Sequence, residues 1–228
     1  AAYVLGKRVG YGHDNMSPNN LGLAMLGACL LWVGWFGFNA GSALAADARA
    51  GMAMVVTMIA AAAGTLSWLL AESVFKGKPS ALGAISGAVA GLVAITPASG
   101  WVFPGPALVI GLAAGIICFW ASTSLKKALG YDDSLDAWGV HGVGGVVGAM
   151  LTGVFAVGTL YVTDGDAAKA MAYSGWLAGN ADMLVIQAKS ILAVAAYSAV
   201  ATFILLKIVD VIVGLRVSEE EEREGLDV

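Results

Sequence analysis

Charged residues are scarce in this chain. They make up 12% of its 228 residues, whereas 59% are hydrophobic and the mean hydropathy is +0.81. Soluble globular domains carry about 25% charged and about 45–50% apolar residues, so the composition excludes that class and indicates a membrane protein with several spans. The net charge of −4 says little about partners, because the acids gather in the final segment "SEEEEREGLDV". We expect a lipid bilayer around the chain and no nucleic-acid partner.

Cysteine is also rare. Cys29 and Cys118 both lie in apolar runs, where they are typical packing residues. Their spacing matches neither a disulfide framework nor a metal site, and no nucleophile, metal cluster or cofactor motif accompanies the ionisable pair His141 and Asp136. The sequence therefore predicts no metal and no cofactor, and it disfavours an enzyme.

Six apolar segments are present, and a span needs about 20 apolar residues to cross the hydrocarbon. The third is short and runs into "TPASG", so we expect its outer end to be broken or capped by a tight turn. Glycine pairs such as Gly87 with Gly91 and Gly144 with Gly148 favour close helix packing, although glycine is common in membrane helices generally. The expected spans, which make residues 21–215 an all-α polytopic unit, are 21–43, 51–70, 82–97, 107–125, 137–159 and 183–215.

The segment before the first span, "AAYVLG", is too short to cross a membrane and lacks the features of a signal peptide. We expect residues 1–6 to be the end of a preceding transmembrane helix, and the chain to be the C-terminal part of a longer protein. Basic residues mark alternate connections, which by the positive-inside rule are cytoplasmic. This makes 7–20 a cytoplasmic loop and 216–228 a cytoplasmic tail. The basic residues concerned are Lys7, Arg8, Lys76, Lys78, Lys126, Lys127, Arg216 and Arg223.

His141 lies inside the fifth apolar segment, in "DDSLDAWGVHGVGG". An ionisable group in hydrocarbon is costly unless it is paired or neutral, so such residues commonly mark a functional path. His141 shares one helical face with Gly145, Gly148 and Thr152. That face is small and polar, so we expect His141 to point toward a packed helix or an internal cavity, away from lipid. A neutral histidine bonded to a neighbouring backbone group is the alternative.

Asp136 stands immediately before this helical pattern. A carboxylate at that position accepts backbone N–H groups and meets the positive end of the helix dipole. We therefore expect Asp136 to cap the helix, and Asp132 and Asp133 to lie in the preceding loop.

A second group of candidate residues lies in "WVGWFGFNAGSA" at the outer end of the first span. Trp35, Phe38 and Ser42 fall at i, i+3 and i+7, on one helical face. Two aromatic rings and a hydroxyl could hold a small cation through the ring quadrupoles and one hydrogen bond. An interfacial aromatic belt is the alternative interpretation.

Four segments together resemble the signature sequences of the Amt/Mep/Rh ammonium transporters, in particular the bacterial Amt branch. They are "GWFGFNAGSA", "AGLVAITPASG", "DDSLDAWGVHGVGG" and "VGLRVSEEEEREGLDV", in family order over nearly the whole chain. The resemblance implies the ammonium transporter fold, in which eleven spans form two inverted repeats plus a long final helix, assembled as a homotrimer. This chain resembles spans six to eleven, which are the second inverted repeat and the final helix, with the end of the fifth.

The resemblance also implies roles for the candidate residues. Trp35 would border the pore, Phe38 would be one ring of an aromatic gate, and Ser42 would help to bind ammonium at the outer site. His141 would be the second of two pore histidines, and Asp136 a structural carboxylate near the pore base. The expected function is uptake of ammonium from outside and conduction of ammonia through a hydrophobic, histidine-lined pore.

The expected location is the bacterial inner membrane with the C-terminus in the cytoplasm, where a PII-type signal protein would be a partner of the tail. Two other classes stay open. The first is an ammonium sensor that signals through its cytoplasmic tail. The second is a membrane-embedded enzyme that uses His141 and Asp136 as an acid–base pair.

Overall fold

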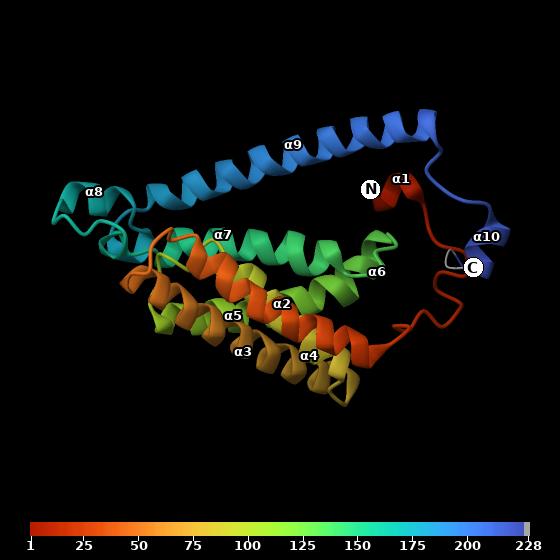
Figure 1. Cartoon of the computed structure of the whole chain (residues 1–228), viewed down its shortest axis with the longest axis horizontal. Helices are drawn as coiled ribbons and strands as arrows, with labels where there is room; N and C mark the ends of the chain where they lie inside the picture. The colour runs from red at the N-terminus through yellow and green to blue at the C-terminus, as the bar shows by residue number, and fades with distance from the viewer. Residues whose placement is uncertain (226–228) are drawn as a thin grey trace.

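The computed structural model describes residues 1–225, and over that range it is helical without strands. The longer helices run back and forth along one bundle (Figure 1). They are α2 (Leu21–Gly41), α3 (Ala48–Lys76), α4 (Ala81–Ile95), α5 (Pro104–Trp120), α7 (Val143–Phe155) and α9 (Asp182–Ile212). The short helices are α1 (Ala2–Leu5), α6 (Lys126–Leu129), α8 (Ala167–Ala172) and α10 (Glu219–Glu224). Two π-helical segments, η1 (Ala121–Leu125) and η2 (Trp138–Gly142), continue α5 and precede α7, and two 3-10 turns are η3 (Gly158–Leu160) and η4 (Trp176–Ala178).

Each of the six expected apolar segments is helical, and the all-α polytopic prediction is confirmed. Within the described residues, five helical stretches are long and apolar enough to cross a membrane, and α4 is a shorter apolar helix of 15 residues. The chain turns directly after α4, over the segment "TPASG". The helix α3 continues past residue 70, the expected end of the second span, and ends at Lys76. The extension is stabilised at Glu72, whose buried carboxylate accepts hydrogen bonds from the Ser80 backbone N–H (2.9 Å) and from Lys76 Nζ (3.2 Å).

The centre of the bundle is formed by α3, α4 and α5, and small residues set its spacing. A Cβ built on Gly87 would lie 2.6 Å from the Gly64 carbonyl oxygen of α3. A Cβ on Gly91 would overlap the Ala60 carbonyl, and one on Gly148 of α7 would overlap the Ala94 carbonyl of α4. The close packing expected from the glycine pairs is therefore confirmed.

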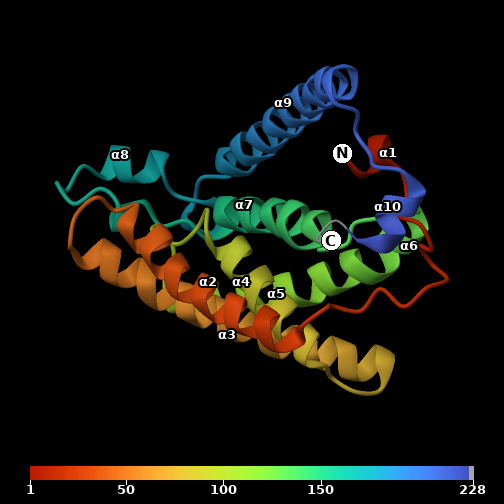
Figure 2. The same ribbon diagram turned by 45° about the vertical axis from the view of Figure 1, so that its right-hand side comes forward.

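Helix α9 is held to the bundle mainly near its own start. A Cβ on Gly153 of α7 would lie 3.1 Å from Gln187 Cγ of α9. Farther along, α9 diverges from α7 (Figures 1 and 2), and none of its residues is buried. A groove of about 940 Å³ separates the two helices, and small and apolar side chains such as Gly145, Ala149 and Val194 line it.

The connections gather at two ends of the bundle. One end carries the loop 7–20, the turn after α3, the segment 126–136 and the helix α10, and the N-terminal helix α1 lies at the same end (Figure 1). We call it the basic end, because all eight basic residues at the connections expected to be cytoplasmic lie at it. The other end, here the opposite end, carries the end of α2, the turn after α4 and the segment 156–181 with α8. Residues 216–225 of the expected tail lie at the basic end, whereas 226–228 lie outside the described residues.

Candidate functional site

His141 lies in the π-helical segment η2, which forms the start of the α7 span at the basic end. Its side chain is exposed to a cavity of about 710 Å³. Apolar residues of α2 and α4, including Leu31 and Val89, form part of the wall. Polar groups occupy the part of the lining nearer the loop, among them Asp14, Lys126 and Asp136. His141 therefore stands between an apolar wall and a polar mouth.

The backbone before His141 departs from a simple helix start. Asp136 has a φ of 52°, in the left-handed region that non-glycine residues seldom adopt. The Val143 N–H then donates to the Trp138 carbonyl five residues earlier, which is the π-helical pattern. Such one-residue insertions are rare among helices as a whole, but those that occur are frequently found at functional sites.

The capping role expected of Asp136 was wrong. Its carboxylate Oδ1 accepts an ion-paired hydrogen bond from Lys126 Nζ at 2.6 Å. The helix is capped by Asp133, whose Oδ2 accepts from the Trp138 N–H at 2.8 Å. The left-handed backbone at Asp136 explains why Asp133 caps the helix in its place. An N-cap side chain reaches the first turn from an extended backbone conformation.

Burial affects the pKa of the Asp136 carboxyl more strongly than the ion pair with Lys126 does. Desolvation raises the pKa of Asp136, and the hydrogen bond and charge of Lys126 oppose that shift. Within the described residues the Asp136 carboxylate is paired with Lys126 and not with His141. The two residues face the same cavity without forming the hydrogen-bonded acid–base pair that an enzyme would need.

Trp35 and Phe38 of α2, and Ser42 at its C-cap, lie toward the opposite end. The rings of Trp35 and Phe38 meet edge to face with centroids 6.2 Å apart. Trp35 Nε1 donates to Thr96 Oγ1 at 2.8 Å. Phe38 is 63% exposed, and the Ser42 hydroxyl donates to the Phe38 carbonyl at 2.7 Å. Because its proton is engaged there, Ser42 Oγ presents lone pairs that could accept an N–H from a cation.

Sequence reasoning missed an aromatic cluster at the same end. The rings of Trp101, Tyr161 and Tyr173 lie 4.7 to 5.7 Å apart, and Arg49 stacks on Tyr161 at 5.0 Å. Arg49 also donates to the Ala43 carbonyl, next to Ser42, at 3.1 Å. These residues come from the start of α3, the turn after α4 and the segment 156–181, so no local pattern could have indicated the cluster.

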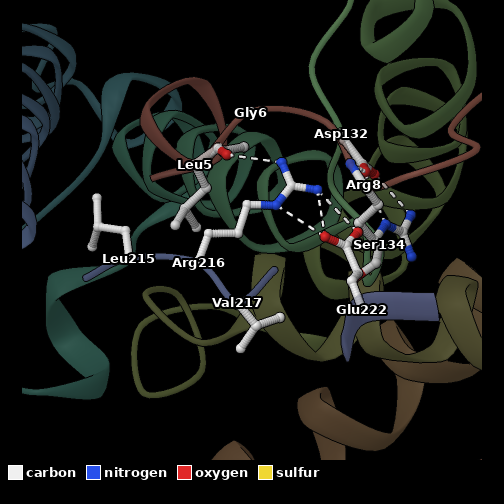
Figure 3. A pocket seen from close by; sticks show the side chains of 10 residues that line it. Leu5, Gly6, Arg8, Asp132, Ser134, Leu215, Arg216, Val217 and Glu222 are labelled. Atoms are coloured by element: carbon white, nitrogen blue, oxygen red, sulfur yellow. Dashed lines mark hydrogen bonds and ion pairs between the residues drawn. The ribbon is translucent and has the colours of Figure 1, made fainter. Parts of the chain in front are cut away.

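A network of charged side chains at the basic end was also missed (Figure 3). Arg216 donates to both carboxylate oxygens of Glu222 at 2.7 to 3.0 Å and to the Leu5 carbonyl at 3.3 Å. Glu222 in turn accepts the Val9 N–H at 2.8 Å. Arg8 forms a bidentate pair with Asp132, at 2.8 and 2.7 Å. The tail, the loop 7–20 and the segment before η2 therefore meet at a pocket of about 380 Å³.

The charges of this network shift one another's pKa values. The hydrogen bond from Arg8 holds the pKa of Asp132 below its ordinary value. The hydrogen bond from the Val9 N–H, with that from Arg216, lowers the pKa of Glu222. Both carboxylates are therefore ionised at neutral pH. Within residues 1–225 no cluster of three or more His, Cys, Asp or Glu side chains could hold a metal ion.

Comparison with known proteins gives consistent results. The family model described as Ammonium Transporter Family matches residues 1–228. An ammonium transporter of Bacillus subtilis is 46% identical over 227 residues, which cover 100% of this chain and 54% of the relative. The crystal structure of Candida albicans Mep2 superposes with a TM-score of 0.85 at 37% identity and covers 96% of this chain and 49% of that one. A structure described as a sensor Amt protein has a TM-score of 0.84 at 32% identity and covers 100% of this chain and 55% of that one. The chain thus spans about half the length of the relatives it matches.

Proposed function

Because the chain belongs to the ammonium transporter family, we propose that it forms part of a membrane pathway that takes up ammonium at the opposite end and conducts ammonia past His141. The observation that supports this proposal most directly is the position of His141. Its imidazole faces a cavity with an apolar wall on a helix apolar enough to span a membrane. One carboxylate of that lining, Asp136, is paired with Lys126.

The chemistry of ammonium accounts for this choice of residues. Ammonium and potassium ions have similar size and charge, so a pore lined with charges would separate them poorly. A path that admits only neutral ammonia excludes potassium, because potassium cannot release a proton. Ammonia still needs a hydrogen-bond partner in an apolar lumen, and a neutral imidazole supplies one without a fixed charge that burial would penalise.

The residues on α2 are suited to the entry step. An ammonium ion at the opposite end would be attracted to the faces of Trp35 and Phe38 and could donate a hydrogen bond to Ser42 Oγ. The hydrogen bond between Trp35 and Thr96 fixes one ring, whereas Phe38 is exposed and free to act as the gate. The edge-to-face contact keeps the two rings together.

The proposed orientation places the basic end in the cytoplasm of a bacterial cell and the opposite end outside. It rests on the positive-inside rule and on the gathering of basic residues at one end. A reporter enzyme that is active only in the cytoplasm, fused after residue 228, should be active. Activity only of a periplasmic reporter would invert the orientation.

We extend the proposal to assembly and regulation. A homotrimer is the assembly that the resemblance implies, and a PII-type protein is the proposed partner of the cytoplasmic face. The contacts of Arg216 and Glu222 with residues 5–9 support a regulatory tail, because they connect it to the loop beside the His141 cavity. Removal of the chain from Gly214 onward should change uptake or its response to an ammonium shock without unfolding the helices.

The substitution His141→Asp in the complete gene product tests the proposed path. A carboxylate beside the path would attract bare cations and remove the need for deprotonation, so we expect a potassium current in reconstituted bilayers. His13→Asp, which changes the other histidine in the loop 7–20, should leave selectivity unchanged. Unaltered selectivity in His141→Asp would contradict the proposal and return His141 to a structural role.

The alternatives make different predictions. A sensor without transport would bind ammonium and alter a tail contact while vesicles containing it took up no methylammonium. The neighbour described as a sensor keeps this test relevant, although the Bacillus subtilis relative is named a transporter. An enzyme would need Asp136 as an acid or base, a role that its ion pair with Lys126 disfavours.

A further inference from the structure

The helix formed by α5, η1 and α6 presents one stripe of side chains to the segment that carries His141. Cys118, Ser122 and Lys126 follow one another at intervals of four residues, so they lie on one side of the helix. Each of them faces η2 or the residues directly before it. The two π-helical segments contact each other at this place.

The first of these contacts holds a carbonyl. Cys118 is buried, and its S–H donates to the Val140 carbonyl oxygen at an S···O distance of 3.8 Å. Val140 directly precedes His141. A sulfur donor is weak, but here it reaches a carbonyl inside a π-helical turn, where the regular helix bonding is interrupted.

The second contact is steric. A Cβ built on Gly139 would overlap Ser122 Oγ and would lie 3.0 Å from the Ser122 backbone nitrogen. Ser122 is buried, and its Oγ has no hydrogen-bond partner among the described residues. Its hydroxyl therefore contributes mainly by filling the space beneath Gly139.

The third contact is electrostatic. Lys126 Nζ reaches both the Asp136 carboxylate at 2.6 Å and the Asp133 carbonyl at 2.8 Å. It thereby fixes the residues at which the chain enters η2. Three kinds of contact, at 133–136, 139 and 140, converge on the segment that ends in His141.

We propose that Cys118 and Ser122 are positioning residues, which seat the π-helical turn η2 and so set the direction in which His141 faces the cavity. This inference rests on the proposed function, in which His141 borders the path of ammonia. An α-helix turns about 100° per residue, so loss of the one-residue insertion would rotate the preceding segment by about that angle. Such a rotation would remove the imidazole from the cavity while leaving the helices in place.

The cysteine contact is tested in the complete gene product by methylammonium uptake into proteoliposomes. Cys118→Ala removes the donor and should lower the maximal rate about threefold, in line with the modest net value of one hydrogen bond, with KM unchanged. Cys118→Ser keeps a donor and should recover most of the loss. Cys29→Ala, at the exposed cysteine on α2, is the matched control and should behave as the unmodified protein. A wild-type rate in Cys118→Ala, or a Cys118→Ser variant as slow as Cys118→Ala, would overturn the role of the donor.

The steric contact has its own test. Gly139→Ala should lower the maximal rate by roughly tenfold or more, because sub-ångström to ångström displacement of a reacting group has large effects on rate. Adding Ser122→Gly removes the overlapping oxygen and should restore the rate to within about threefold. A Gly139→Ala variant with full activity, or a double variant no faster than Gly139→Ala, would overturn the steric part. Failure of Gly139→Ala to fold would count in the same way if Ser122→Gly did not restore folding.

A His141→Ala variant distinguishes failure of the proposed path along His141 from failure of the positioning role of Cys118 and Ser122. If His141→Ala leaves rate and selectivity unchanged, the proposed path along His141 fails, and the positioning inference fails with it. If His141→Ala alters transport but the Cys118 and Gly139 variants do not, only the positioning inference is overturned. A purely structural role would lower the yield of protein in Cys118→Ala and Cys118→Ser alike, without distinguishing the variant that retains a donor.

Discussion

At the scale of single residues, Trp35 shows how one hydrogen bond can prepare a binding surface. Its Nε1 donates to Thr96 Oγ1 at 2.8 Å, and the Thr96 hydroxyl donates to the Leu92 carbonyl at 2.7 Å. The second bond orients the threonine oxygen as an acceptor for the first. The indole of α2 is thus attached to the end of α4, and Phe38 packs against a ring that cannot turn freely.

The Trp35–Thr96 pair should show energetic coupling. Trp35→Phe and Thr96→Val each remove one partner, and in a double-mutant cycle the coupling should be about 1 kcal/mol, the usual net value of a neutral hydrogen bond. The measurement is thermal or denaturant unfolding of the purified protein in detergent. Additive effects of the two substitutions would show that the bond contributes nothing measurable.

Asp132 gives stability a pH dependence of defined sign. The hydrogen bond from Arg8 lowers the pKa of Asp132 in the folded protein. The contribution of Asp132 to the free energy of unfolding is therefore fully present above the ordinary carboxyl pKa of 3.8. It is lost as the pH falls through the lower pKa of the folded state. Asp136 acts in the opposite sense, because burial raises its pKa and the folded state then favours the protonated form.

The consequence for Arg8 can be measured. Arg8→Gln should lower the melting temperature at pH 7 and reduce the further loss that acid causes in the unmodified protein. The Asp132 side chain is buried, but the Arg8 side chain is 42% exposed, so solvent screening at the arginine keeps the effect on the order of 1 kcal/mol or less. Lys7→Gln is the matched control at the adjacent exposed position. An identical pH profile in Arg8→Gln would remove Asp132 from the acid response.

At the scale of the elements, α10 is short but well terminated. Ser218 and Glu221 form a capping box, in which the Glu221 carboxylate accepts from the Ser218 N–H at 2.9 Å. This arrangement stabilises the first turn and turns the next residue, Glu222, toward Val9 and Arg216. Composition alone would predict that this run of glutamates is solvated, but two of them have specific partners: Glu221 binds Ser218, and Glu222 binds Val9 and Arg216.

Glu222→Gln should release α10 from the loop 7–20. The amides of residues 216–225 should exchange with deuterium faster, because an amide oxygen is a weaker acceptor for Arg216 than a carboxylate is. Glu220→Gln, an exposed residue of the same helix, should leave exchange unchanged. Equal exchange rates in both variants would mean that the tail is held by other contacts.

The helices were the part of this fold that the sequence predicted well, because hydropathy acts over whole segments. The π-helical turns were not predicted. An insertion of one residue leaves the apolar pattern around His141 almost unchanged, so no periodicity separates η2 from a regular helix. Asp136 was misassigned for a related reason, since its left-handed backbone is a property of the loop and not of the residue type.

At the scale of the whole molecule, the missed contacts share one property. Arg8 and Asp132 are separated by 124 residues, and Val9 and Glu222 by 213. A local pattern carries no information about such pairs, and only the antiparallel course of the helices brings them to the basic end. The candidate residues Trp35, Phe38, Ser42 and His141 could be named from spacing and resemblance, but which partner each one contacts depends on tertiary packing.

These 228 residues, expressed alone, should not restore growth at low ammonium in cells that lack ammonium uptake. The chain spans about half the length of its relatives, Phe38 is 63% exposed, and the groove beside α7 is open, so we expect the described helices to enclose only part of the proposed path. Joining the chain to the part of the Bacillus subtilis relative that it does not match is the comparison that should restore uptake. Growth with the 228 residues alone, in cells without a related transporter, would contradict this expectation.

The shape of α9 has a mechanical consequence. Its 31 residues span about 46 Å at 1.5 Å per residue, and its firm contact with the bundle is near Gly153, close to its first turns. Among the described residues, a helix that is held mainly at one end can act as a lever. A tilt of about 5° at the fulcrum would carry the far end through about 4 Å, more than the 2.8 Å bond from Val9 to Glu222 can follow. The hydrogen bonds and ion pair of Glu222 with Val9 and Arg216 would then break or re-form when α9 tilts by a few degrees. Such a tilt is too small to disturb the packing of α3, α4 and α5.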